Sequence, residues 1–353
     1  MNEKRFYLDI HAIQTLPPSN VNRDDTGSPK TALYGGVRRA RISSQSWKRA
    51  MRQYFLKESG VNLGVRSLDV IKYLADRIIE ADSTITEDES MKIADKIFND
   101  AGIKTKDQKT KALFFLGKDQ ADRLAEAAIN GEKDKTVLKK IFSENPAVDI
   151  ALFGRMVADD PSLNEDASSQ VAHAISTHEV QTEFDFYTAV DDLAPEDNAG
   201  AGMLGTVEYN SSTLYRYANI AIHELADQLG SKEQAIEAAK LFIEAFANSM
   251  PTGKSNTFAN QTLPQMLMIN VRCDRPVNLV TAYENPVKSR NGNVGPSIER
   301  LFSEVKKTEK FVQEPVKTIY IVEEDIDRPD WATEVKNISE LMNDFEKTAE
   351  GLL

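Results

Sequence analysis

Basic residues are concentrated in one short stretch near the amino end, GGVRRARISSQSWKRAMR at residues 35–52. Its cations are Arg38, Arg39, Arg41, Lys48, Arg49 and Arg52. The segment without any Asp or Glu extends over residues 26–57, although the whole chain has a formal net charge of −12. A solvated helix face is the alternative interpretation, but such faces usually mix charges of both signs. The stretch therefore favours contact with a phosphate backbone.

The local pattern indicates which elements position these cations. VRRARIS, residues 37–43, alternates as a short strand, and Ser43 or Ser44 is suited to cap a helix over residues 44–57. One face of that helix is apolar: Trp47, Ala50, Met51 and Tyr54. The helical cations lie off this face, where they can reach solvent or a ligand. A helix start also presents free backbone N–H groups, which favour an anion.

Composition limits the class of protein. The chain has 353 residues, of which 41% are hydrophobic, so it is long enough for a substantial core. Its single cysteine, Cys273, excludes an internal disulfide framework and is expected to be a buried, inert thiol in an apolar strand. We find no signal-peptide pattern and no apolar run long enough to cross a membrane, and therefore expect a cytoplasmic protein.

The periodicity changes along the chain. Strand patterns occur near residues 5–16, 169–180, 185–193, 206–222, 266–273 and 318–324, with an amphipathic helix over 231–250. The alternation over residues 5–16 predicts a strand with one face buried. Residues from about 60 to 165 have helical periods throughout, including 65–80 and 108–130. This order predicts an α+β fold, with a sheet domain of residues 1–59 and 166–353 interrupted by a helical domain of residues 60–165.

Motifs for catalysis are weak. PTGKS at residues 251–255 lacks the first glycine of a phosphate-binding loop, because residue 248 is Asn. Lys254 is still suited to touch a phosphate as a point charge. The four histidines and one cysteine do not have metal-ligand spacing, so we expect no metal site. Asp24 and Asp25 form an acid pair in a turn-rich loop, where capping or an ion pair is a stronger interpretation than catalysis.

A different kind of segment runs from Asp191 to Thr206, DDLAPEDNAGAGMLGT. Its Ala/Gly-rich tip carries Met203 and Leu204 and lies between strand patterns, which predicts a protruding hairpin or loop of about residues 188–208. Exposed apolar tips mark contact surfaces, and in nucleic-acid binders Met and Leu can wedge between bases. The alternative is that both side chains only anchor a loop.

Several segments together resemble one known family, the CasC family, which is the repeated backbone subunit of the type I-E CRISPR surveillance complex, Cascade. The segments run in order from residue 6 to about residue 300: PPSNVNRDDTGSPKTALYGGVRRARISSQSWKRAMR, VDIALFGRM, VAHAISTHEV, DFYTAVDD, GTVEYNSSTLYRYANI and PTGKS.

The resemblance implies a hand-like molecule. Its palm would be a sheet like that of an RNA-recognition motif, which is ferredoxin-like, its fingers the helical domain, and its thumb the protrusion. Copies would stack head to tail along a guide RNA, each thumb displacing one guide nucleotide on its neighbour, and present the guide to a target DNA strand. The family acts as a binding scaffold without a cofactor or metal, beside other Cascade subunits, and cutting belongs to a recruited helicase-nuclease. Base pairing, and not the protein, would read the sequence.

The resemblance also implies roles for individual residues. Those expected to hold the guide backbone are Arg23, Lys30, Arg41, Ser43, Gln45, Lys48, Arg49 and Arg52. Those expected to pack against bases at the displaced position are Met156 and Met203 or Leu204. Trp47 is expected in the palm core.

Two alternatives remain. One is an RNA-binding module that acts alone, without forming a filament. The other is a metal-dependent ribonuclease using Asp24 or Asp25, because related backbone subunits of RNA-targeting CRISPR complexes cut RNA with a loop aspartate.

Overall fold

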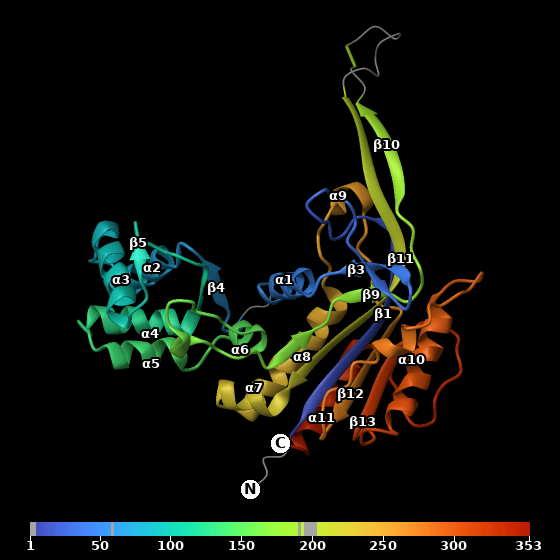
Figure 1. The fold of residues 1–353 in the computed structure, drawn as a ribbon. Helices are drawn as coiled ribbons and strands as arrows, with labels where there is room; N and C mark the ends of the chain where they lie inside the picture. Colours follow the sequence, from blue (N-terminus) through green and yellow to red (C-terminus); the bar gives the residue numbers. More distant parts are fainter. Residues whose placement is uncertain (1–4, 58–59, 190–191, 194–202) are drawn as a thin grey trace.

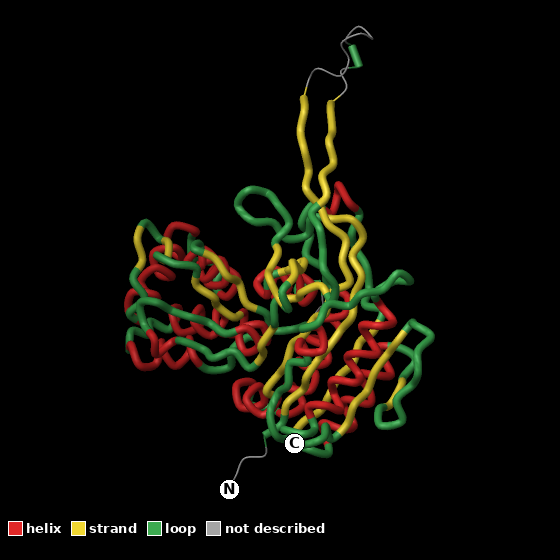
Figure 2. The backbone as a smooth tube through the Cα atoms, turned by 45° about the vertical axis from the view of Figure 1, so that its right-hand side comes forward, coloured by secondary structure: helices red, strands yellow, loops and turns green. Residues whose placement is uncertain are grey.

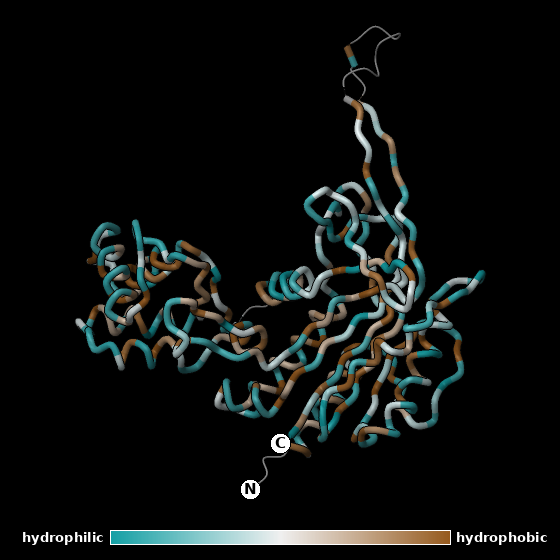
Figure 3. Tube along the Cα trace, viewed as in Figure 1, coloured by the Kyte–Doolittle hydropathy of each residue, from teal (hydrophilic) through white to brown (hydrophobic). Residues whose placement is uncertain are grey.

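The computed structural model describes residues 5–57, 60–189, 192–193 and 203–353. Figure 1 shows two bodies joined at helix α6 (Val148–Phe153). The larger body is built on a long twisted sheet and is called the sheet body. The smaller one is built around the four helices between residues 70 and 143 and is called the insertion, and the predicted domain bounds of residues 60–165 stay a prediction. Hydrophobic segments recur in both (Figure 3), as expected for bodies that each bury apolar side chains.

One large sheet organises the sheet body, with the strand order β14-β13-β12-β1-β11-β9-β3-β2, and β8 and β10 pair with β11 outside this path. Its strands are β1 (Tyr7–Ser19), β2 (Thr31–Tyr34), β3 (Val37–Ile42), β8 (Ser169–Val171), β9 (Ala174–Ser176), β10 (Glu183–Ala189), β11 (Met203–Ala221), β12 (Met266–Arg272), β13 (Lys317–Val322) and β14 (Thr333–Glu334). Pairing is antiparallel except between β13 and β14. The expected α+β class is confirmed, and the narrower likeness to an RNA-recognition motif stays a prediction.

Strand β1 lies at the centre of this sheet. The sequence predicted a strand with one buried face, but β1 is buried on both faces over most of its length. It pairs with β11 on one side and β12 on the other, and helices cover both faces. Leu8, Ile10 and Ala12 pack on one face, and Asp9 and His11 are buried on the other. Because this second face carries polar residues, the hydrophobic pattern did not predict that it is buried.

Helices complete the fold. They are α1 (Ser44–Phe55), α2 (Val70–Ala81), α3 (Glu87–Ala101), α4 (Lys118–Ile129), α5 (Lys135–Ser143), α6 (Val148–Phe153), α7 (Ile222–Leu229), α8 (Lys232–Asn248), α9 (Ser255–Phe258), α10 (Val294–Thr308) and α11 (Ile338–Glu350), with 3-10 turns at Pro161–Leu163 and Val280–Tyr283. Helices α1, α7, α8 and α11 share a core with one face of the sheet, and α10 packs on the opposite face. Helix α8 is the amphipathic helix expected from the sequence.

The insertion has its own apolar core, built from α2, α3, α4 and α5. Two predicted helices are too long. The stretch 65–80 begins as strand β4 (Gly64–Ser67), and the stretch 108–130 contains strands β6 (Lys109–Thr110) and β7 (Phe114–Gly117). Strand β7 is buried and pairs with β4, while β6 pairs with β5 (Thr105–Lys106). Short apolar runs do not distinguish a buried strand from a helix turn, which explains the error.

Helix α6 connects the two bodies. Its Ala151 and Leu152 belong to the core of the sheet body, although α6 falls between α5 and the strands that return to the sheet. Ser168 and Ser169 donate hydrogen bonds from their hydroxyls to the carbonyl oxygens of Ala151 and Leu152. The end of the inserted segment is thereby fastened to the sheet body.

A two-stranded hairpin stands out from the sheet in both Figure 1 and Figure 2. It is formed by β10 and the first part of β11, with Glu183 opposite Tyr209 and Ala189 opposite Met203. This hairpin occupies the region where the sequence predicted a protrusion. Its tip, residues 190–191 and 194–202, and the side chain of Met203 lie outside what the structure describes.

The expectation for Cys273 was wrong. The thiol is exposed, because strand β12 ends at Arg272 and Cys273 begins the turn that follows. In the part of the chain that the structure describes, no helix is long and apolar enough to cross a membrane.

Candidate nucleic-acid interface

Helix α1 is fixed by a cap and by an apolar face. Ser43 is the N-cap: its Oγ accepts a hydrogen bond from the backbone N–H of Ser46, and its own N–H donates to Oδ1 of Asn22 over 2.9 Å. The buried face consists of Trp47, Ala50, Met51 and Phe55. The core position expected for Trp47 is confirmed, because its side chain is 1% exposed. The polar residues of α1 therefore project away from the sheet.

A groove of about 1090 Å³ runs between α1 and the insertion, and we call it the α1–insertion groove. Its lining includes Gln45, Lys48, Arg49, Arg52 and Met156. Five residues that the sequence predicted to contact RNA are thus brought around one groove. The Met156 side chain is 82% exposed, so its apolar surface is available to a base.

Lys48 is a partly buried cation of α1 that lines this groove. Its Nζ lies 5.7 Å from the centre of the Phe153 ring, and partial burial lowers the pKa of its ammonium group. No carboxylate forms an ion pair with it among the described residues. A phosphate would supply the missing negative charge.

Arg52 has a structural partner. Its Nε lies 3.0 Å from Oδ2 of Asp149, a carboxylate that is 2% exposed, and its Nη2 donates to the carbonyl oxygen of Gly64. The guanidinium also lies over the Phe115 ring, 4.4 Å from its centre. Burial raises the pKa of Asp149, while the neighbouring Arg52 lowers it. Arg52 therefore fastens α1 to the insertion, and its contact with RNA stays a prediction.

A second groove, of about 780 Å³, lies between α1 and the 249–254 loop, and we call it the α1–loop groove. Its cations are Arg23, Arg49, Lys57 and Lys254. Arg49 lines both grooves, so it lies where they meet along α1. Sequence reasoning missed Lys57 as a site residue, although it closes the acid-free segment.

Lys30 and Arg41 lie together at the outer edge of the sheet. The backbone N–H of Arg41 donates to the carbonyl oxygen of Lys30, and its guanidinium donates to the carbonyl oxygen of Thr31 and to Nδ1 of His173. Burial, with the positive charges of Arg41 and Lys30, lowers the pKa of His173. Both cations line a small depression beside the base of the 20–30 loop.

Arg39 is not a surface cation, although it belongs to the basic stretch. Its side chain is fully buried and donates to the carbonyl oxygens of Tyr34, Ser176 and Tyr283. It therefore joins strand β3 to β9 and to the 3-10 turn at Val280–Tyr283. The sequence shows that residue 39 is a cation, but it does not predict that the side chain is buried.

The two regions that are predicted to pack against bases lie on different elements. Met156 follows α6, whereas Leu204 is 67% exposed on the projecting hairpin, and the two views show these regions apart. Phe184 and Phe186 are 66% and 65% exposed on the same face of the hairpin as Leu204, because the register places Phe186 opposite Thr206 and Thr188 opposite Leu204. Sequence reasoning missed both rings. Their alternation with Glu183 and Asp185 is the pattern that could have indicated a strand with two aromatic side chains on one face.

Asp24 is occupied within its own loop. Its Oδ1 accepts hydrogen bonds from the hydroxyl and the N–H of Thr26 and from the N–H of Ser28, at 2.7, 3.0 and 3.0 Å. The hydroxyl of Thr26 is the main cause of a lowered Asp24 pKa. This is the capping role that a turn-rich loop indicates. The described residues contain no group of three or more His, Cys, Asp or Glu side chains placed to hold a metal ion.

The sequence matches the CT1975-like protein family over residues 8–344. The chain belongs to this family. A structure titled "CRISPR RNA-guided surveillance complex, pre-nicking" contains a chain with 33% identity and a TM-score of 0.85, and the match covers 97% of this chain and 100% of that one. A second, "CRISPR RNA-guided surveillance complex", gives 28% identity, a TM-score of 0.67, and coverage of 97% and 99%. No curated protein matches. The resemblance to the CasC family of backbone subunits is confirmed.

Proposed function

We propose that this protein is the guide-RNA-binding backbone subunit of a type I-E Cascade complex. The observation that carries the proposal is the outward side of α1, where Lys48 and Arg49 have no acidic partner among the described residues and face a groove that also presents exposed Met156. Cations without partners suit a phosphate backbone, and an apolar side chain beside them suits a base. The two related chains belong to RNA-guided surveillance complexes, which supports this proposal.

The proposed assembly is head to tail. The hairpin of one copy, with Phe184, Phe186 and Leu204 exposed, would reach the next copy and displace one guide nucleotide there. A heterologous contact of this kind extends as a helix and does not close, so RNA length and other Cascade subunits would limit it. The target DNA strand would pair with the exposed guide bases, and a recruited helicase-nuclease would do the cutting. This chain would itself be a scaffold and not an enzyme.

The test is co-purification of guide RNA from cells that express the protein with its neighbouring subunits and a guide precursor. The wild-type assembly should carry RNA of uniform length, and Lys48→Ala with Arg49→Ala should lose it while keeping a native circular dichroism spectrum. The matched control is Lys72→Ala with Lys96→Ala, two exposed lysines of the insertion, which should retain the RNA. A Lys48/Arg49 variant that still carries full-length guide would refute the proposal.

The ribonuclease alternative has a direct test on the same assembly. Incubation with complementary RNA and Mg²⁺ should leave that RNA intact. Cleavage at regular spacing that disappears in Asp24→Asn or Asp25→Asn would establish the alternative instead.

A further inference from the structure

The α1–loop groove has the charge of a phosphate site. None of its four cations forms an ion pair with a described residue, and the groove's acidic lining residue, Asp24, is held by Thr26 and Ser28. Unpaired cations that face one hollow repel one another, which costs free energy unless an anion joins them. A polyanion is therefore a better occupant of this groove than a neutral ligand.

The loop that forms one wall is held in a strained conformation. Lys254 has a φ of 51°, in the left-handed region that favours glycine. Just before it, Gly253 lies so close to the 20–22 segment that an added Cβ would be 2.0 Å from the carbonyl oxygen of Val21. Strain of this kind persists at sites where the surrounding structure fixes a side chain for a ligand. The packing of Gly253 on Val21 therefore fixes the position of the backbone next to Lys254.

The wall of this groove also contains an unused polar group. Ser249 is 5% exposed, and its hydroxyl has no hydrogen-bond partner. A buried hydroxyl without a partner costs free energy, which a hydrogen bond to an incoming oxygen would recover. Ser249 follows α8 directly, so a rigid helix fixes its position.

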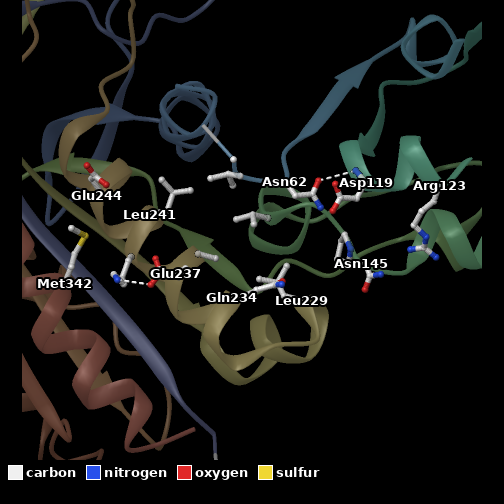
Figure 4. A pocket seen from close by; sticks show the side chains of 16 residues that line it. Asn62, Asp119, Arg123, Asn145, Leu229, Gln234, Glu237, Leu241, Glu244 and Met342 are labelled. Atoms are coloured by element: carbon white, nitrogen blue, oxygen red, sulfur yellow. Dashed lines mark hydrogen bonds and ion pairs between the residues drawn. The ribbon is translucent and has the colours of Figure 1, made fainter. Parts of the chain in front are cut away.

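A third hollow provides the contrast. It measures about 830 Å³ and lies between α8 and the insertion, on the side shown in Figure 4. Its cations already have partners: Lys240 lies 2.8 Å from Glu237 and 3.0 Å from Glu346, and Arg123 pairs with Glu144. A hollow with paired charges of both signs is not suited to a phosphate chain. Unpaired cations therefore distinguish the α1–loop groove from a similar hollow in the same molecule.

We propose that the α1–loop groove binds a second phosphodiester segment of the guide, through Lys57, Lys254 and the hydroxyl of Ser249. This inference rests on the proposed function and extends it. The guide backbone then contacts both flanks of α1, with Arg49 shared between the two grooves.

The test measures binding of a single-stranded RNA to the purified full-length protein as a function of salt. Lys57→Gln with Lys254→Gln removes two charges and leaves polar side chains that are one atom shorter. The slope of log affinity against log salt should therefore become shallower by about 1.4, or roughly 0.7 per lost contact. Lys57→Arg with Lys254→Arg keeps both charges and should give the wild-type slope. Ser249→Ala should weaken binding but leave the salt slope unchanged. The matched control is again Lys72→Ala with Lys96→Ala, which should match the wild type.

Each result decides between distinct possibilities. A normal slope for the Lys57/Lys254 variant, together with a shallower one for Lys48→Ala with Arg49→Ala, would overturn the second segment and leave the proposed function standing. Wild-type protein that binds no RNA would overturn both. The same binding measurements are repeated with a single-stranded DNA of the same sequence. Equal losses for RNA and DNA would support a phosphate contact, whereas a loss confined to RNA would assign the groove to the 2′-hydroxyl and overturn the phosphodiester assignment.

Discussion

At the scale of single residues, the basic stretch divides into cations that hold the fold and cations that remain free. Arg39 and Arg52 are held by buried carbonyl or carboxylate partners, whereas Lys48 and Arg49 have no acidic partner among the described residues. All four have the same sequence signature, a cation without a nearby acid in the chain. Asp149, the partner of Arg52, lies 97 residues away, so local sequence could not separate the two groups.

Loss of Arg52 should destabilise the protein strongly. Arg52→Ala would leave Asp149 buried without its cation, and breaking a pair of this kind costs about 3 kcal/mol of unfolding free energy. Arg49→Ala, three residues earlier on the same helix, removes an exposed cation and should change stability by no more than about 0.5 kcal/mol. Urea unfolding of the RNA-free protein measures both. Equal stabilities for the two variants would show that the Arg52–Asp149 pair does not hold α1 to the insertion.

Asp9 should make stability depend on pH. Burial raises the pKa of its carboxyl to about 7, although Tyr217 and the N–H of Val277 donate hydrogen bonds to it. Because the folded state binds this proton more tightly than the unfolded state, the contribution of Asp9 is fully present below pH 4. It falls as pH rises towards 7, by up to about 1.4 kcal/mol per pH unit.

The measurement for Asp9 is the unfolding free energy of wild type and Asp9→Asn between pH 4 and pH 8. The wild type should lose stability relative to the variant as pH rises. Burial lowers the pKa of the nearby His11 to about 3, so the contribution of His11 to stability has the opposite pH dependence. Because His11 is present in both proteins, the difference between wild type and Asp9→Asn isolates the contribution of Asp9. Parallel pH curves would contradict the assignment.

At the scale of elements, the sequence predicted most strands of the sheet, helix α8, and helix α1 with its capping serine. It missed what depends on neighbours in space. Strand β7 looked helical because its buried run is short, and β1 looked half exposed because its second face carries Asp9 and His11. Motifs that resemble a known family predicted five residues that line the α1–insertion groove, but not the groove itself. The α1–loop groove did not, because it needs the position of the 249–254 loop relative to α1.

The hairpin is the element with the clearest unused apolar surface. Phe184→Ser with Phe186→Ser removes two exposed rings, so the stability of the single chain should change by no more than about 0.5 kcal/mol. If this face contacts the next copy, fewer copies should assemble on each RNA, as measured by light scattering of the complex. Val137→Ser, which removes an exposed apolar side chain from α5, should assemble normally. Unchanged assembly of the Phe184/Phe186 variant would exclude this face of the hairpin from the contact.

At the scale of the whole molecule, charge is divided between regions. Residues 156–215 contain twelve acids and no Lys or Arg, so the formal charge of this segment equals the net charge of the whole chain, −12. This segment includes the hairpin, so the element that projects furthest is acidic while α1 is basic. Acidic surfaces repel free nucleic acid and leave the cationic grooves as its place of attachment. An acidic hairpin is also better suited to a basic protein surface than to the RNA backbone.

We propose that guide RNA lies along both flanks of α1. The most direct measurement is ultraviolet crosslinking of the assembled complex, with the crosslinked peptides identified by mass spectrometry. We expect crosslinks in peptides that contain residues 44–57 and 249–258, on the two sides of the grooves. Crosslinks confined to α10 and the opposite face of the sheet, with both peptides unmodified in an RNA-saturated complex, would contradict it.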